Sequence, residues 1–359
     1  MTSSASAIAA YGLPTRRRME DRRLSDDAFG SVLATCESHR LLGILAKAVR
    51  EDAVVVSPAS EVELETMHRA WLTHALRVER LLLDATAALD RAGIPSRVLK
   101  GVALAHTAYT DPSDRVFGDL DLLVPGDQLS RASETLASAL GGCRVQPELR
   151  HGFDDHFGKE VLLRVGSLEL DLHRTFVEGA YGLTVRLDDL FAPPYRFPLG
   201  ATELEALPMP QRFLHACYSA ALGDWPPRLM SLRDVAQLVH REQPNLVDVL
   251  LMARAWRCEP VVARAVNLAW DELALTAEPP VVAWARRFVP SDRQRRMLSW
   301  HQGPARAFTR HAAAVLVLHG ANARFAYLQA IVFPQRSYLA ARGLSATGHA
   351  RRAWHRMFG

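Results

Sequence analysis

The chain has 359 residues, of which 49% are hydrophobic and 23% charged, and its formal net charge is +4. These values are ordinary for a soluble globular protein. No run approaches 18 uninterrupted apolar residues, so the sequence excludes a transmembrane helix and predicts no membrane partner. The four cysteines are scattered without a C-x-x-C spacing, which indicates reduced thiols in a cytoplasmic protein.

Basic residues gather at both ends of the chain, including Arg16, Arg17 and Arg18 at the start and Arg351, Arg352 and Arg356 at the end. Such ends are able to bind nucleic acid or an acidic partner, but the pattern favours solvated tails. Residues 1–24 are small, polar and then basic, so we predict a disordered basic N-terminus.

Residues 25–94 are predicted to form N-terminal helices that pack on the core. Apolar residues recur at helical spacing from Asp26 to Arg50, and again in a long pattern from Glu61 to Ala92. Pro58 separates the two patterns, and Gly93 supplies a stop signal for the second.

The stretch from Arg97 to Val124 reads as a strand, a helix, a turn and a second strand that carries Asp119 and Asp121. Because side chains alternate along a strand, both carboxylates face one side while Leu120, Leu122 and Val124 face the core. Paired carboxylates repel unless a cation lies between them, and oxygen ligands of this kind suit Mg²⁺.

The start of the same stretch favours a phosphate ligand. Gly101 allows a close approach of the backbone, and the helix that follows presents amide groups at its N-terminus. Lys100 is one of three lysines in a chain with forty arginines. A solvated edge strand would explain the D-x-D pair alone, but the combination indicates a metal-bound nucleotide.

The next signal is a hairpin, because two hydrophobic runs at 159–165 and 168–174 are joined by Gly166-Ser167. In its second strand Glu169, Asp171 and His173 share one face. A second strand therefore buries leucines and displays carboxylates.

We predict an α+β fold, with a small mixed sheet and flanking helices. Residues 95–205 would form the α/β core, and residues 206–359, which read almost entirely as helix, would form a helical C-terminal domain. The boundary lies in a Pro- and Gly-rich stretch from Val177 to about Pro210, with a possible strand near Tyr195.

The order of LKGVALAHTAY, TDPSDR, VFGDLDLLV and LELDLHR resembles a bacterial family of uncharacterised nucleotidyltransferases in the DNA polymerase β-like nucleotidyltransferase superfamily. The resemblance covers most of residues 28–240 and includes the helical segment FLHACYSAALGDWPPRLMSLRDVAQLV. It implies an enzyme that transfers a nucleoside monophosphate from an NTP, with ATP expected, to an unidentified hydroxyl-type acceptor and releases pyrophosphate.

The resemblance also implies roles for individual residues. Asp119, Asp121 and Asp171 would be the catalytic residues and would hold two Mg²⁺ ions. Lys100, Gly101 and Arg115 would contact the triphosphate, while Glu169 and His173 would support the metal ligands or contact the acceptor.

Two positions depart from the family pattern. Val102 follows Gly101 where the superfamily usually has Gly or Ser, and Ser219 occupies a place where a histidine is expected. The first departure keeps open an alternative, a catalytically silent nucleotide-binding regulatory or scaffold protein. A further alternative is the modification of a peptide, a protein or tRNA, so the acceptor stays open between a small molecule and a peptide.

Overall fold

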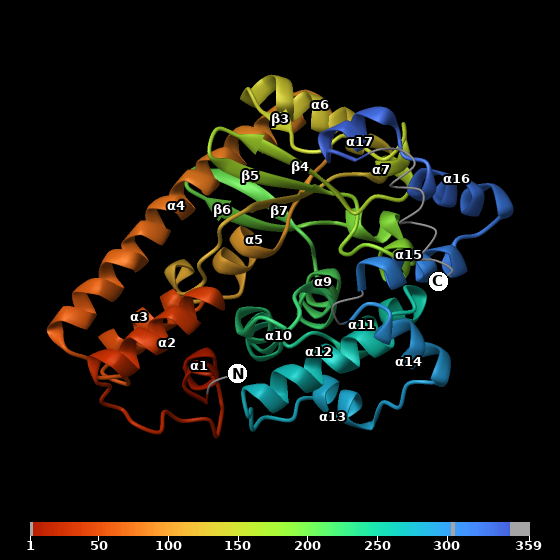
Figure 1. Ribbon diagram of the computed structural model, residues 1–359. Helices are drawn as coiled ribbons and strands as arrows, with labels where there is room; N and C mark the ends of the chain where they lie inside the picture. The colour runs from red at the N-terminus through yellow and green to blue at the C-terminus, as the bar shows by residue number, and fades with distance from the viewer. Residues whose placement is uncertain (1–2, 303–305, 345–359) are drawn as a thin grey trace.

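The computed structural model describes residues 3–302 and 306–344, with a mixed sheet in the upper half of the view and a helical half below it (Figure 1). The strands are β1 (Arg97–Val98), β2 (Leu120–Leu123), β3 (Cys143–Arg144), β4 (Glu160–Val165), β5 (Leu168–His173), β6 (Tyr195–Leu199) and β7 (Thr202–Ala206). Their order in the described sheet is β3-β4-β5-β2-β1-β7-β6. β2 runs parallel to β5 and β1 to β7, and the other neighbours are antiparallel.

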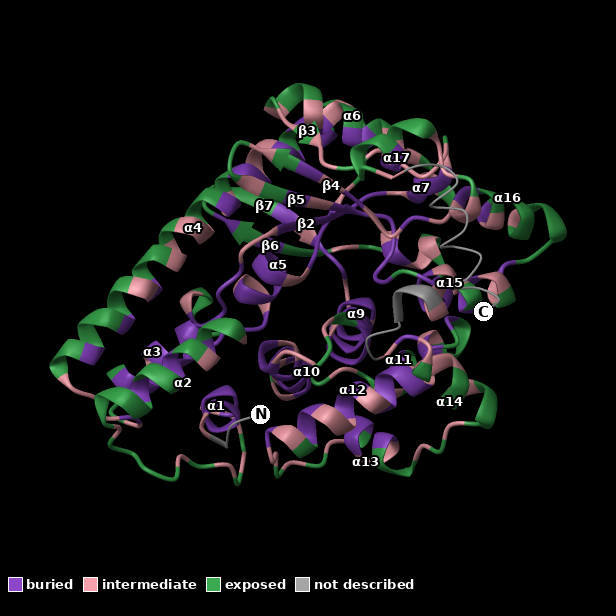
Figure 2. Cartoon of the chain, viewed as in Figure 1, coloured by how far each residue is buried: buried purple, intermediate pink, exposed green. Residues whose placement is uncertain are grey.

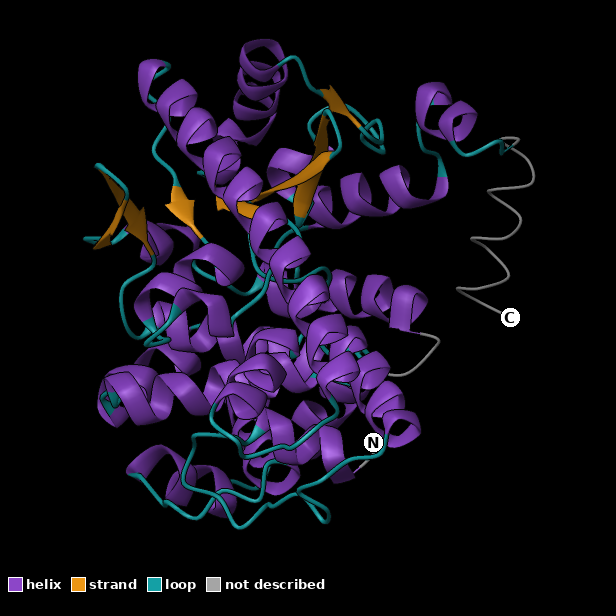
Figure 3. Ribbon diagram, turned by 90° about the vertical axis from the view of Figure 1, so that its left-hand side faces the viewer, coloured by secondary structure: helices purple, strands orange, loops and turns teal. Residues whose placement is uncertain are grey.

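Helices surround this sheet and fill the rest of the described chain (Figure 3). The α-helices are α1 (Ser3–Ala9), α2 (Asp26–Ser38), α3 (Leu42–Arg50), α4 (Pro58–Arg91), α5 (Lys100–Thr107), α6 (Leu129–Leu140), α7 (Phe153–His156), α8 (Ala180–Leu183), α9 (Gln211–Tyr218), α10 (Leu229–Glu242), α11 (Leu246–Ala255), α12 (Glu259–Glu272), α13 (Pro280–Arg287), α14 (Asp292–Ser299), α15 (Arg306–Val317), α16 (Ala321–Val332) and α17 (Arg336–Ala341). Shorter turns are η1 (Pro112–Asp114), η2 (Gly126–Gln128), η3 (Leu187–Phe191) and the π-helical η4 (Ser219–Gly223).

The α+β fold is confirmed, and so is the predicted hairpin, which appears as β4 and β5. The strand expected near Tyr195 is β6. It forms a second hairpin with β7, a strand that was not predicted from the sequence. The segment Val145 to Arg150 is not a strand, because the pairing of β3 with β4 covers only Cys143 and Arg144.

The long helix α4 connects the two halves of the molecule (Figure 1). Ser57 caps its N-terminus by accepting a hydrogen bond from the Ser60 amide, and Pro58 suits the first helical turn. Leu64, near its start, is buried in the helical half, whereas Leu82 and Leu89, near its end, pack against the sheet. One helix therefore contributes to both cores.

Two hydrophobic clusters carry most of the burial (Figure 2). One lies between the sheet and helices α4, α5 and α6, and it contains Leu120, Leu122 and Val124 as predicted. The other joins the N-terminal helices to α9–α13, and it contains Leu123, which points to the opposite face of β2. The face of the sheet that carries Asp121 is therefore turned toward the helical half.

The predicted disorder of residues 1–24 is wrong for the described part of this segment. Ala5 and Ile8 on α1 are buried in the second cluster, because small side chains let this helix pack closely on α10. Arg233 donates hydrogen bonds to the carbonyl oxygens of Ala9 and Tyr11 at 2.6 and 2.7 Å. Tertiary contacts therefore order a segment whose composition suggested disorder.

Three other expectations concern the division of the chain into domains, its basic C-terminal end and the absence of a membrane helix. The division of the chain at about residue 205 stays a prediction. The basic residues after position 344 lie outside the described residues. In the part of the chain that the structure describes, no helix has both the length and the apolar character needed to cross a membrane.

Candidate active site

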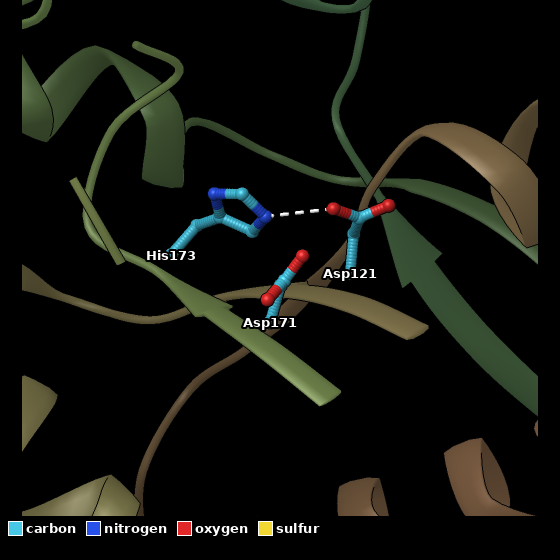
Figure 4. A group of neighbouring side chains, drawn as sticks. All are labelled: Asp121, Asp171 and His173. Atoms are coloured by element: carbon cyan, nitrogen blue, oxygen red, sulfur yellow. Dashed lines mark hydrogen bonds and ion pairs between the residues drawn. The ribbon is translucent and has the colours of Figure 1, made fainter. Parts of the chain in front are cut away.

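Two neighbouring parallel strands bring the predicted carboxylates together. Asp121 on β2 lies directly opposite Asp171 on β5, and His173 follows two residues later on the same face. The ligand atoms of these three residues all lie within 4.8 Å of one another. Figure 4 shows the two carboxylates and the imidazole directed toward a common point.

Asp121 is the most heavily contacted member of this group. Its Oδ1 accepts hydrogen bonds from Lys100 Nζ and His173 Nε2, each at 2.7 Å, and the residue is only 3% exposed. Burial acts to raise the pKa of Asp121, but Lys100 and His173 outweigh it and hold this pKa well below its usual range. Asp121 is therefore an anion in the folded protein.

The pKa of Asp171 is shifted in the opposite direction from that of Asp121. Burial, together with the negative charges of Glu160 and Asp121, raises the pKa of Asp171 to about 7. Among the described residues it has no hydrogen bond or ion pair with another side chain. A cation next to Asp171 would relieve this repulsion.

Lys100 reaches Asp121 from the start of α5. Its φ is +32°, in the left-handed region that residues with a side chain rarely adopt, at a typical cost of about 1–3 kcal/mol. The next residue, Gly101, packs under Phe117, because a Cβ atom there would lie 2.7 Å from the Phe117 Cβ. Close packing thus explains this glycine, and its predicted contact with phosphate stays a prediction.

Asp119 lies just before β2 and takes a different partner. Its Oδ1 is 3.1 Å from Nη1 of Arg40, which belongs to the turn between α2 and α3. Asp119 lines the same cavity as Asp121 and Asp171 but does not join their close group. The structure therefore brings together two of the three predicted metal ligands, with His173 as the third member of the group.

Arg115 is held in a buried ion pair. Its Nε and Nη2 donate to Asp234 on α10 at 3.0 and 2.8 Å, and Tyr109 donates to the same carboxylate at 2.8 Å. Burial acts to lower the pKa of Arg115, but Asp234 outweighs it and raises this pKa. Arg115 lines the cavity, although its guanidinium is already occupied in joining the sheet region to the helical half.

Glu169 is not brought to the site. It is exposed at the start of β5 and lies 3.4 Å from Arg164 across the hairpin. The strand alternation places it on the same face as Asp171, but at the far end of the strand from His173. Its predicted role in binding stays a prediction.

Several residues at the site were not predicted from the sequence. Glu160 lies 3.3 Å from His173 Nδ1 and 2.5 Å from Lys159. It therefore places a further carboxylate and a further ammonium next to the group formed by Asp121, Asp171 and His173. His215 on α9 also lines the cavity. The scarcity of lysine was a usable signal for Lys159, but nothing in the sequence marks Arg40 or His215.

These residues face a cavity of about 430 Å³. Its lining combines Asp119, Asp121 and Asp171 with basic side chains, which include Arg40, Lys100, Lys159 and Arg310. Carboxylates beside several cations suit a polyanionic ligand that binds together with metal ions.

A second cavity, of about 730 Å³, adjoins the first and shares Lys159, Glu160, Glu178 and Arg310 with it. Its wall includes an aromatic group, Phe153, Phe157 and Tyr327, whose ring centroids lie 5.4–5.7 Å apart. Helices α15, α16 and α17 supply part of this wall.

The donor set fits a magnesium site. Asp121 and Asp171 offer carboxylate oxygens, the donors that Mg²⁺ prefers, and the raised pKa of Asp171 reflects negative charge from Glu160 and Asp121 that a bound cation would offset. Asp121 and Asp171 would hold the ion, with His173 beside them.

Replacing Asp171 by asparagine is expected to stabilise the metal-free protein at pH 8. The folded-state pKa is raised, so the contribution of Asp171 to stability is full below about pH 4 and is lost as the pH rises through about 7. We expect Asp171→Asn to raise the melting temperature in EDTA by about 1–2 °C at pH 8, or about 1 kcal/mol, and by less than half of that at pH 5.

Thermal unfolding at the two pH values measures this difference. Glu169→Gln is the matched control, since Glu169 lies on the same face of β5 but is exposed. Equal effects of Asp171→Asn at both pH values would contradict the raised pKa.

Comparison with known families gives one match of wide coverage. A family model described as an uncharacterised nucleotidyltransferase matches residues 25–271, more than half of the chain. No curated protein matches the chain.

Two solved structures of the antibiotic-resistance factor ANT(2'')-Ia are similar to part of the chain, each at 16% sequence identity. The solution structure covers 51% of this chain and 92% of its own, with a TM-score of 0.35. The crystal structure, in complex with adenylyl-2"-tobramycin, covers 50% of this chain and 96% of its own, with a TM-score of 0.37. Likenesses at this level say nothing about the substrate of the chain.

Proposed function

The chain belongs to the uncharacterised nucleotidyltransferase family, and on that premise we propose a Mg²⁺-dependent transfer of a nucleoside monophosphate from an NTP, with ATP expected, to a hydroxyl-type acceptor. In this reaction the acceptor oxygen forms a bond with the α-phosphorus, the bond from that phosphorus to the bridging oxygen breaks, and pyrophosphate leaves. The acceptor loses its hydroxyl proton.

One observation carries the proposal. The parallel register of β2 and β5 sets Asp121 opposite Asp171, and both face a cavity lined by cations. A structural ion-pair network would neutralise its own carboxylates, whereas Asp171 is left without a partner among the described side chains. This arrangement suits a site that is completed by a metal-bound polyanion.

The residues of the site have distinct proposed roles. Asp121 and Asp171, with Asp119 beside them, would hold two Mg²⁺ ions. When bound, these ions would offset charge on the phosphates and on the entering and leaving oxygens. Lys100 pairs with Asp121 and Arg40 with Asp119, and both line the cavity, so their charges are placed to contact phosphate oxygens. Asp171 is the candidate to take up the acceptor's proton, because its pKa is raised to about 7.

His173 and Glu160 would act on the metal ligands rather than on the substrate. His173 is fully buried and donates from Nε2 to Asp121, while Glu160 lies 3.3 Å from its other ring nitrogen. Burial, and then the charge of Lys100, lower the pKa of His173, so the ring is neutral at pH 7. The Nε2–H of His173 would fix the orientation of the Asp121 carboxylate, while Glu160 adds negative charge beside the metal ligands and so helps to raise the pKa of Asp171.

We place the acceptor in the second cavity, because it opens beside Lys159 and Glu160 and is large enough for a molecule of substantial size. Aromatic and apolar side chains on its wall suit a partly apolar acceptor. A crystal structure with a reaction product bound would test this placement, and electron density for the acceptor in a different location would contradict it.

The proposed reaction is tested with the purified protein, each of the four labelled NTPs, Mg²⁺ and a mixture of small hydroxyl-bearing molecules as the source of an acceptor. We expect Mg²⁺-dependent nucleotide binding, release of pyrophosphate, and loss of both on addition of EDTA. The assay also separates the alternative of a silent binding protein, which would bind the nucleotide without pyrophosphate release. Absence of binding and of turnover with every NTP would rule out the proposed function.

A further inference from the structure

His215 is a buried histidine with a free hydrogen-bonding atom at the site. It lies on α9, is 4% exposed, and its ring stacks on Phe176 with the centroids 4.4 Å apart and the planes at 21°. Its Nε2 is buried and has no hydrogen-bond partner within the described chain. A buried polar atom without a partner costs about 1–3 kcal/mol, so a bound molecule is the expected source of the partner.

His215 differs from other histidines with a buried ring nitrogen because it lines a cavity. His215 and Phe176 both line the first cavity. His240 also has an unpartnered Nε2 and stacks on an aromatic ring, that of Trp270, but it lies outside both cavities. His215 is thus a candidate for ligand contact, and His240 is a natural control.

The charges around His215 indicate the kind of group that it would contact. Burial, and then the positive charge of Lys100, lower the pKa of His215 well below its usual range, so the ring is neutral. A neutral imidazole both donates and accepts hydrogen bonds, which suits a hydroxyl better than a phosphate. Phosphate oxygens have Lys100, Arg40 and Lys159 in the same cavity.

The position of His215 further narrows the set of hydroxyl groups that it would contact. The ring lines the same cavity as Lys100 and Asp121, and the charges of these two side chains act on it. His215 therefore shares the first cavity with the carboxylates that would hold the metal ions at the α-phosphorus. Two kinds of hydroxyl would lie in this part of the cavity: the acceptor hydroxyl, and the 2′- and 3′-hydroxyls of the ribose that is joined to that phosphorus through O5′.

We propose that His215 is a substrate-contacting residue, and that its Nε2 forms a hydrogen bond with a hydroxyl group next to the α-phosphorus. The hydroxyl belongs either to the ribose of the NTP or to the acceptor. This assignment rests on the proposed nucleotidyl transfer and adds to it a residue that recognises the sugar or the acceptor.

Two variants of His215 separate hydrogen bonding from packing. His215→Phe keeps a ring to stack on Phe176 but removes Nε2, whereas His215→Gln places an amide near the position of Nε2. His240→Phe makes the same chemical change outside the cavity. Circular dichroism and melting temperature establish that each variant is folded before it is compared.

The first arm of the experiment measures equilibrium binding of the α,β-methylene analogue of ATP with Mg²⁺, and of its 2′-deoxy and 3′-deoxy forms. A ribose contact predicts that His215→Phe weakens binding of the ribonucleotide by about 3- to 10-fold and that His215→Gln recovers part of it. The deoxy form that lacks the contacted hydroxyl should then bind equally to the wild type and to His215→Phe.

The second arm measures pyrophosphate release from the NTP that the wild type uses, in the presence of the acceptor mixture used to test the proposed function. An acceptor contact predicts unchanged binding of the analogue and a fall in turnover of about tenfold in His215→Phe, with partial rescue in His215→Gln. If His215→Phe matches both the wild type and His240→Phe in the two arms, the proposal is wrong. If the wild type itself binds no nucleotide, the proposed function fails first, and this inference fails with it.

Discussion

Replacing Asp121 by asparagine is expected to lower pyrophosphate release by about 1000-fold, which corresponds to about 4 kcal/mol of transition-state stabilisation. Asparagine has nearly the same shape but no charge, so the site loses the carboxylate that Lys100 and His173 both contact. The substitution also leaves the Lys100 ammonium without its 2.7 Å partner. Steady-state pyrophosphate release with Mg²⁺ and the preferred NTP measures the loss.

The matched control for this variant is Glu169→Gln, which removes a carboxylate from the same face of the sheet at an exposed position. We expect it to retain activity within a factor of about two, as is usual for an exposed ion pair. A folded Asp121→Asn protein with wild-type activity would remove Asp121 from the catalytic site.

Replacing Arg115 by methionine is expected to lower the free energy of unfolding by about 3–5 kcal/mol. The substitution leaves the Asp234 carboxylate buried without its bidentate partner, since both side chains of the pair are 7% exposed. The effect should appear as a lower midpoint of urea unfolding with an unchanged slope.

A double variant tests whether the loss comes from the unpaired charge. Replacing both Arg115 by methionine and Asp234 by leucine should cost less than Arg115→Met alone, because neither charge is then left buried. The exposed pair of Arg196 and Glu203 provides a control, and Glu203→Ala should cost less than about 1 kcal/mol. An Arg115→Met protein as stable as the wild type would show that the pair does not hold the two halves together.

The central strands were predictable because their side chains alternate. The pattern of leucines and carboxylates at 119–124 and at 168–173 assigns each residue to a face, and Leu120 and Leu122 lie in the predicted core. The close approach of Asp121 to Asp171 depends on the strand order, which places β5 next to β2 across about fifty residues of sequence. Local patterns do not contain that information, and the family resemblance supplied it.

The partners of the site residues were not predictable. Arg115 was expected at the phosphates, but its partner Asp234 is 119 positions away on α10. His215 lies in a helical run where the neighbours are buried as well, so the sequence does not show which side chain meets the cavity. Charge and periodicity describe single elements, whereas these contacts arise between elements.

The N-terminal helix α1 is another case in which contacts between elements were not predictable from the sequence. Small residues in a polar setting predict disorder when only composition is considered, yet α1 is packed and Ser6 donates a hydrogen bond to Glu272 at 2.6 Å. That partner lies at the end of α12, far along the chain. A short segment with little apolar surface is ordered here by the elements that surround it.

The wall that α15, α16 and α17 give to the second cavity comes from residues after 271, where the family match ends. The carboxylates on β2 and β5 come from residues before that point. An exchange of the terminal segment would therefore reshape the space beside the carboxylates while leaving the carboxylates in place. If the acceptor binds there as proposed, a change in the terminal segment would alter one part of the acceptor wall, while the part formed by Phe153 and Phe157 stays with the carboxylates.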